Sequence, residues 1–284
     1  MSHSLLKIPN GLGLLVAGAS LRQVIDGLGT VARHGFQEVQ INLSWHPYAA
    51  EDLHRLALIL RERSLRCSAV GVYCDLLQAE SHHFFDTSCQ QIRELLPQLS
   101  SIGAGLIVVW SGSYADNLLA DDPRNHSEEV KWQLQQNVET LAPLLRAYNA
   151  RLVIEPWKTH VLGDATSLAD FCNANSGIAS AVLDVPNVLD PRDWPNRKEK
   201  SVELIRALQD CAGIAHLKDM TVKGGGSFEL PGPGLGEMDY DTILQALKPL
   251  WRKVPFVIEH VSEQQIDSVA RFVIDGMCAQ GYES

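Results

Sequence analysis

The sequence predicts an α/β protein, folded as a single (β/α)8 TIM barrel domain that spans residues 1–284. Short runs rich in branched apolar residues alternate with longer segments of helical period, and eight such runs can be counted. Eight strand–helix units over about 250 residues match the size of this barrel. No G-x-G-x-x-G follows the first strand, which argues against the competing doubly wound sheet that binds dinucleotides.

The eight candidate strands carry this prediction. Each is a short apolar run bounded by polar or turn-forming residues, as expected of parallel strands that are buried on both faces. In chain order they are GLLVAG (13–18), EVQIN (38–42), CSAVGVY (67–73), GLIVVW (105–110), RLVIEP (151–156), SAVLDV (180–185), GIAHLK (213–218) and PFVIEH (255–260).

The segments between the strands carry helix start and stop signals. Ser20 and Gln23 have the spacing of a capping box, and Gly35 follows the first helical segment as its C-terminal stop. The GGG at 224–226 falls in a loop after the seventh strand and is typical of a mobile lid. Helical period also marks the segments 51–63, 127–148, 240–251 and 262–277.

Composition limits the class of protein. Apolar residues make up 45% and charged residues 20%, which is typical of a soluble globular chain. The 24 basic and 34 acidic residues give a net charge of −10, which argues against a nucleic-acid-binding surface. Six scattered cysteines without a C-x-x-C pair indicate reduced thiols. With no signal peptide and no apolar run of about 20 residues, we expect a cytoplasmic protein without a membrane partner.

Ionisable side chains stand at the ends of the last four strands. In a TIM barrel the active site lies at the carboxyl ends of the strands. Because side chains alternate between the two faces of a strand, these groups share the inward face and are expected to converge at the barrel mouth. The four residues are Glu155, Asp184, His216 and Glu259.

Three carboxylates and one imidazole form a ligand set for one divalent metal ion. Without a cation the carboxylates would repel one another, and at least one would stay protonated. The mostly oxygen set favours Mn²⁺, with Mg²⁺, Co²⁺ or Zn²⁺ as alternatives. Taken singly, His216 is equally well explained as a core histidine, and Glu155 or Glu259 as a helix cap or the partner of an arginine. Four equivalent positions on consecutive strands favour the metal site.

Further residues near the strand ends are candidates for substrate contact. Trp110, Trp157 and Trp194 offer aromatic faces that pack against sugar rings, and the alternative for them is loop packing. His46 and Tyr73 stand in similar positions. Lys218 shares the face of His216, so it is either a substrate-binding group or part of a salt bridge at the rim.

The strand-end motifs resemble those of a known family. They are IEP at Glu155, LDVPN at Asp184, HLKD at His216, PGPGLGEMDY at 231–240 and VIEH at Glu259. In order and spacing, over essentially the whole chain, this set is similar to the sugar phosphate isomerase/epimerase superfamily of xylose-isomerase-like TIM barrels. The resemblance implies one divalent metal on the same four residues, a role in carbohydrate metabolism and a homo-oligomer.

Two positions depart from the family pattern and bear on the substrate. Keto-sugar epimerases of the family commonly carry His three residues after the metal-binding Asp. Here that position is Asn187, which we assign to a substrate hydrogen bond. Pro156, Trp157 and Lys158 follow the first glutamate, where relatives often have Asn or His.

The expected function is that of a metal-dependent isomerase or epimerase of a keto-sugar or sugar phosphate. The metal would bind the substrate carbonyl and a neighbouring hydroxyl and stabilise the enediolate that forms when the α-proton leaves. Glu155 and Glu259 are the expected general base and general acid. The main alternative is a metal-dependent dehydratase of the inosose-dehydratase type, which shares the first step. A DNA-repair endonuclease is disfavoured by the acidic balance, and a catalytically silent sugar-binding protein is the fourth possibility.

Overall fold

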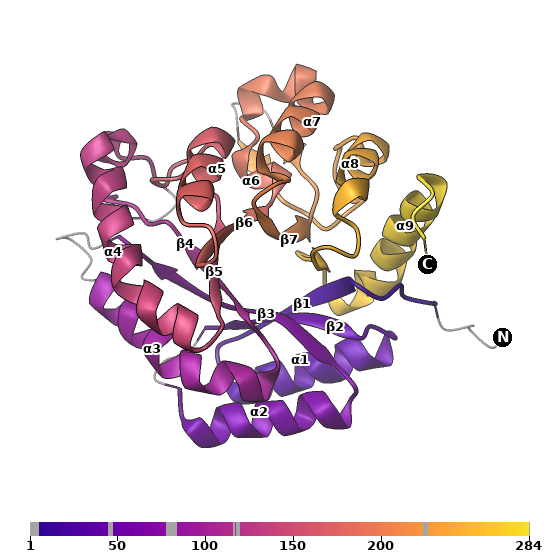
Figure 1. Cartoon of the computed structure of the whole chain (residues 1–284). Helices are drawn as coiled ribbons and strands as arrows, with labels where there is room; N and C mark the ends of the chain where they lie inside the picture. Colours follow the sequence, from indigo (N-terminus) through magenta and orange to yellow (C-terminus); the bar gives the residue numbers. More distant parts are fainter. Residues whose placement is uncertain are drawn as a thin grey trace.

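The computed structural model is a closed barrel of eight parallel strands surrounded by helices (Figure 1). It describes residues 6–44, 48–77, 84–115, 117, 120–223 and 227–283, and for residues 84–89 it describes the backbone alone. The strands follow the order β1-β10-β7-β6-β5-β4-β3-β2, and β1 closes the ring by pairing with both β10 and β2. The predicted fold class is confirmed.

The predicted strands are all present, and their ends lie within two residues of the predicted ends. β6 stops before the predicted end because Asp184 caps the short helix α6 (Val185–Val188), accepting a hydrogen bond from the Asn187 N–H at 3.3 Å. The barrel strands are β1 (Leu12–Gly18), β2 (Glu38–Leu43), β3 (Arg66–Asp75), β4 (Leu106–Trp110), β5 (Arg151–Glu155), β6 (Ala179–Leu183), β7 (Ala212–Leu217) and β10 (Phe256–Ile258).

A small antiparallel hairpin, β8 (Thr221–Val222) with β9 (Phe228–Glu229), follows β7. The sequence predicted only a loop here, because two-residue strands are too short to show an alternating pattern. The GGG at 224–226, predicted to be a lid, lies outside the described residues.

The helices form the outer layer around the strands in Figure 1. Half of the predicted capping box forms: the Ser20 hydroxyl accepts from the Gln23 N–H at 3.4 Å, whereas the Gln23 side chain accepts from the Ala19 N–H rather than from Ser20. Gly35 takes a left-handed φ of +82° beyond the last turn, as predicted. No helix in the described ranges is both long and apolar enough to cross a membrane. The remaining helices are α1 (Leu21–Arg33), α2 (Ala50–Glu62), α3 (Phe84–Ile102), α4 (Glu128–Ala147), α5 (Ala165–Ala174), α7 (Arg197–Leu208), α8 (Tyr240–Leu247) and α9 (Ile266–Ala279).

Two separate apolar cores lie on the two faces of the barrel wall. The larger core packs the outward side chains of the strands, such as Ile154, Leu217 and Ile258, against the helices. The smaller core fills the barrel interior with Ala69, Val108, Val153, Val182, Ile214 and Val257. Side chains alternate along each strand, so the next inward side chain lies two positions further on. After Val153, Val182, Ile214 and Val257 these inward residues lie at the barrel mouth. The interior core therefore forms the floor beneath the polar site.

Asp219 ties the loop 231–239 to the end of β7. Its carboxylate is buried and accepts backbone N–H groups from Met220 (2.8 Å), Gly234 (3.0 Å) and Met238 (2.9 Å). A Cβ at Gly236 would lie 2.5 Å from Asp219 Oδ1, so the loop backbone approaches as closely as only glycine allows. The aspartate of the HLKD motif is therefore a structural anchor for the segment that leads into α8.

We predict that Asp219→Ala lowers the free energy of unfolding by about 3 kcal/mol, because three backbone N–H groups, two of them buried, lose a charged acceptor. Urea unfolding measures this loss. Asp210→Ala, at an exposed position ahead of β7, serves as the control and should leave the midpoint unchanged. Equal effects of the two substitutions would contradict the anchoring role.

Candidate functional site

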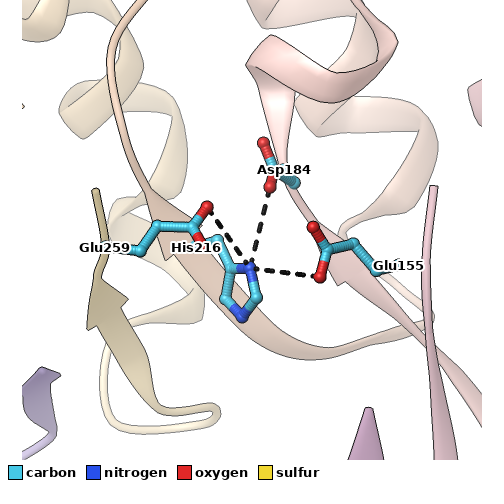
Figure 2. A group of neighbouring side chains, drawn as sticks. All are labelled: Glu155, Asp184, His216 and Glu259. Carbon is cyan, nitrogen blue, oxygen red and sulfur yellow. Dashed lines mark ion pairs between the residues drawn. The ribbon is translucent and has the colours of Figure 1, made fainter. Parts of the chain in front are cut away.

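The four predicted ligand residues lie together at the carboxyl ends of neighbouring strands. Glu155 ends β5 and His216 lies near the end of β7. Asp184 follows β6, and Glu259 follows β10. The barrel order places these strands side by side, so closure of the barrel brings the four side chains to one point. Figure 2 shows the three carboxylates arranged around one nitrogen of the His216 ring.

One ligand atom from each residue faces a common centre. These four atoms lie within 4.8 Å of one another. His216 Nδ1 is 3.6 Å from Asp184 Oδ2, 3.6 Å from Glu259 Oε1 and 3.8 Å from Glu155 Oε2. Donor atoms that share one cation at about 2.1 Å lie about 3.0 to 4.2 Å apart, so the three distances to Nδ1 suit a single ion.

The same four atoms are buried and lack hydrogen-bond partners. They are Glu155 Oε2, Asp184 Oδ2, His216 Nδ1 and Glu259 Oε1. Buried polar atoms without partners are rare in folded proteins because each costs the desolvation energy of the group. Lys218 pairs with two of the four atoms, and a divalent cation at their common centre would bind all four at once.

Lys218 supplies positive charge beside this cluster. Its buried Nζ lies 2.7 Å from both Asp184 Oδ2 and Glu259 Oε1 and forms an ion pair with each. Burial opposes the charged ammonium, but the surrounding carboxylates more than offset this and raise the pKa of Lys218 above its usual value. The lysine is therefore a charged member of the site.

Burial and neighbouring charges shift the pKa values of the cluster residues in different directions. Burial opposes the imidazolium, but Glu259 and the other carboxylates outweigh it and raise the pKa of His216 to about 9. Burial also opposes ionisation of Asp184, yet Lys218 and His216 hold its pKa at about 2. For Glu155 burial dominates and raises the pKa of the carboxyl. The site thus contains one carboxylate that stays ionised and one that binds a proton more readily.

Asn187 contacts the cluster rather than open space. Its Nδ2 donates to Glu155 Oε1 at 2.8 Å, and the side chain is buried in α6. This bond holds one carboxylate oxygen of Glu155 and leaves Oε2 facing His216. The residue predicted to bind substrate therefore orients Glu155 in this structure.

A cavity of about 720 Å³ opens above the cluster. Its floor includes Glu155, Lys218 and Glu259, whereas the side chains of Asp184 and His216 lie beneath. The rest of the lining combines apolar, aromatic and polar side chains, as in sites for small polar ligands. These residues are Leu15, Ala17, Asn42, Tyr73, Trp110, Trp157, Leu230, His260, Val261 and Ser262.

Of the aromatic residues predicted to contact substrate, some line this cavity and one does not. Trp110 and Trp157 line the cavity, where Trp110 packs edge-to-face on Tyr73 with ring centroids 5.4 Å apart. Trp194 does not line this cavity, because it lies in the 3₁₀ turn Pro191–Asn196 with the Arg197 guanidinium over its ring. His46 lies outside the described residues.

Two polar residues of β2 were missed by the sequence analysis. Gln40 and Asn42 point into the barrel, and Gln40 Oε1 lies 2.9 Å from His216 Nε2. The signal was present, because these residues sit two apart in EVQIN and so share one face of the strand. Both side chains are uncharged and lie within the strand, so the pattern of ionisable strand ends does not include them.

One protein-family model matches most of this sequence. The family model described as xylose isomerase-like TIM barrel matches residues 28–275. No curated protein matches the sequence.

Solved structures similar to this chain share its fold at low sequence identity. A xylose isomerase-like TIM barrel protein from Mycobacterium smegmatis in complex with magnesium has a TM-score of 0.66 and 14% identity, covering 91% of this chain and 90% of that one. D-psicose 3-epimerase with D-tagatose from Clostridium cellulolyticum H10 has a TM-score of 0.67 and 16% identity, with coverages of 94% and 98%. The IOLI protein with a bound zinc atom has a TM-score of 0.69 and 16% identity, with coverages of 96% and 99%.

The match of the family model extends from α1 to α9 and includes every strand that contributes to the cluster. The chain therefore belongs to the xylose isomerase-like TIM barrel family.

Proposed function

We propose that the chain is a divalent-metal-dependent isomerase or epimerase that moves a proton next to the carbonyl group of a small sugar-like substrate. The observation that carries this proposal is the convergence of four buried ligand atoms, from three carboxylates and one imidazole, beneath a cavity with aromatic and polar walls. The printed names of several similar structures, among them an L-ribulose 3-epimerase and D-psicose 3-epimerases, support the class of reaction.

Glu155, Asp184, His216 and Glu259 would hold the cation, with Mn²⁺ as the first choice for this mostly oxygen set. A bound dication would supply Lewis-acid stabilisation of the negative charge that develops on the substrate oxygens.

Glu155 and Glu259 are the proposed proton-transfer pair. Both line the cavity floor and come from different sides of the barrel mouth, on β5 and after β10. Burial raises the pKa of Glu155 toward the working range of a general base, and Asn187 fixes one of its oxygens. Lys218 pairs with Glu259 and can donate to a substrate oxygen from the cavity floor.

The aromatic walls suit the apolar face of a sugar. Trp110 and Tyr73 pack edge-to-face on one side, and Trp157 packs on Phe228 with centroids 6.4 Å apart. Such surfaces exclude water around the reacting carbon and leave polar groups to fix the hydroxyls.

We predict that purified protein binds one equivalent of Mn²⁺ and that His216→Ala weakens this binding at least about tenfold, because one of four ligands is lost. Titration calorimetry and metal analysis after desalting measure both quantities. His126→Ala, at an exposed position, should bind as tightly as the wild type. Wild-type protein that binds no Mn²⁺, Mg²⁺, Co²⁺ or Zn²⁺ would refute the proposal.

Metal binding should release a proton below about pH 9. Metal-free His216 has a pKa of about 9, so it holds a proton at neutral pH that must leave before Nδ1 can bind a cation. The apparent affinity should therefore fall by about tenfold for each pH unit below that value. Calorimetry at pH 7.5 in two buffers of different ionisation enthalpy counts the protons, and a count of zero contradicts the assignment of His216 as a ligand.

Deuterium uptake from D₂O tests the proton transfer itself. With a panel of ketoses, their phosphates and inososes and saturating Mn²⁺, we expect exchange at the α-carbon of at least one substrate. Glu155→Gln and Glu259→Gln should each slow it by about 100-fold or more, whereas the exposed Glu128→Gln should not.

The product of the same NMR experiment distinguishes the reactions. An isomer or epimer supports the proposal, whereas loss of water without an isomer assigns the chain to the dehydratases that share this first step. Absence of exchange on the whole panel counts against both enzymatic assignments and favours a binding protein.

A further inference from the structure

The two ring nitrogens of His216 have different surroundings. Nδ1 faces the three carboxylates, whereas Nε2 points away from them in Figure 2. Nε2 lies 2.9 Å from Oε1 of Gln40, whose side chain is fully buried. A neutral imidazole carries one proton, so a partner that fixes its position on one nitrogen decides the role of the other.

Gln40 reaches His216 through the interior of the barrel. It belongs to β2, and β1 and β10 separate this strand from β7 in the barrel wall. The contact therefore does not belong to sheet pairing. Gln40 and Asn42 share the inward face of β2, and Gln40 lies beneath the cavity that Asn42 lines.

The amide of Gln40 is held in one orientation. Its Nε2 donates to Asn42 Oδ1 at 3.1 Å and lies 3.5 Å from the Tyr73 hydroxyl, so Oε1 is the atom left for His216. We call Gln40, Asn42 and Tyr73 the polar clamp. An amide oxygen can only accept, and it therefore requires the proton of His216 to be on Nε2.

The backbone of β3 near Gly71 leaves room for the side chains of the polar clamp. A Cβ at Gly71 would lie 2.2 Å from Asn42 Oδ1 and 2.8 Å from the Tyr73 ring, so glycine at this position makes room for both side chains. Tyr73 itself adopts a left-handed φ of +44°, which is costly for an aromatic residue. The strand β3 loses its regular pairing with β4 over the same stretch, between Gly71 and Asp75.

We propose that Gln40 is a positioning residue that keeps the proton of neutral His216 on Nε2 and thereby presents Nδ1 as the cation ligand. The inference rests on the metal site proposed above. A neutral acceptor orients the imidazole without adding a fourth carboxylate to the three already buried there. The polar clamp thus links the cavity wall on β2 and β3 to the ligand set on the opposite side of the barrel.

Metal affinity separates this role from simple space filling. Gln40→Leu keeps the approximate volume and removes the acceptor, and it should weaken Mn²⁺ binding by about 10- to 100-fold. Gln40→Glu keeps an acceptor for Nε2–H, although it adds a fourth buried carboxylate, and should bind Mn²⁺ more tightly than Gln40→Leu. Gln37→Leu makes the same chemical change at an exposed position next to β2 and should have no effect. Calorimetry with MnCl₂ gives all three affinities.

The tautomer itself is measurable in the wild-type protein, so this test does not depend on the folding of the Gln40 variants. Long-range ¹H–¹⁵N correlation spectra of ¹⁵N-histidine-labelled, Zn²⁺-loaded protein should show His216 with its proton on Nε2. The signal is assigned by its loss in His216→Gln. A proton on Nδ1, or Gln40→Leu binding Mn²⁺ as tightly as wild type, would overturn the inference.

Failure of the metal site and failure of the polar clamp give different results. Wild-type protein that binds no cation would refute the proposed function. The spectrum of metal-free protein, taken at a pH where the ¹⁵N shifts show a neutral ring, would then still decide the role of Gln40. The proton on Nε2 supports the polar clamp in that case, and the opposite tautomer contradicts it.

Discussion

The burial of three carboxylates around one imidazole is the constraint on which the rest of this structure depends. Each charged oxygen has left water, and repulsion among like charges a few ångströms apart must be compensated by positive charge. Lys218 supplies part of it at 2.7 Å from two of the carboxylates, and protonated His216 supplies more. A divalent cation would replace the proton of His216 and bind the same buried oxygens. As a purely structural feature the cluster would destabilise the fold, whereas a bound cation would compensate the repulsion among its carboxylates.

Barrel closure is what makes this concentration of charge attainable. Four strands in a row deliver one side chain each, and the interior apolar residues directly below support them. Residues around the cluster then restrict its freedom. Asn187 holds one oxygen of Glu155, Gln40 holds the far nitrogen of His216, and Asp219 anchors the loop that leads into α8. The four ligand atoms themselves face inward, and Lys218 is the cation that pairs with two of them.

The polar clamp orients His216, and the aromatic side chains of Trp110, Trp157 and Tyr73 form an apolar wall of the cavity. Tyr73 takes part in both, because its ring packs on Trp110 and its hydroxyl lies near Gln40. Burial, with Glu155 and Glu259 nearby, raises the pKa of Tyr73 well above its usual value, so its hydroxyl stays a neutral donor. A substrate that contacts this wall would therefore also contact a residue tied to the orientation of His216.

The sequence by itself determined the barrel, its strands and the four residues of the cluster. These follow from local patterns: apolar runs set the strands, and the two-residue alternation sets which strand-end side chains face inward. Tertiary structure decided what those patterns do not encode. Asn187 turned toward Glu155 because Asp184 caps α6, and Trp194 packed under Arg197 away from the cavity. Gln40 met His216 across the interior, between strands that are distant in the chain. Such contacts depend on how the barrel closes and how its loops turn, because distances across the barrel are fixed only when all eight strands have paired.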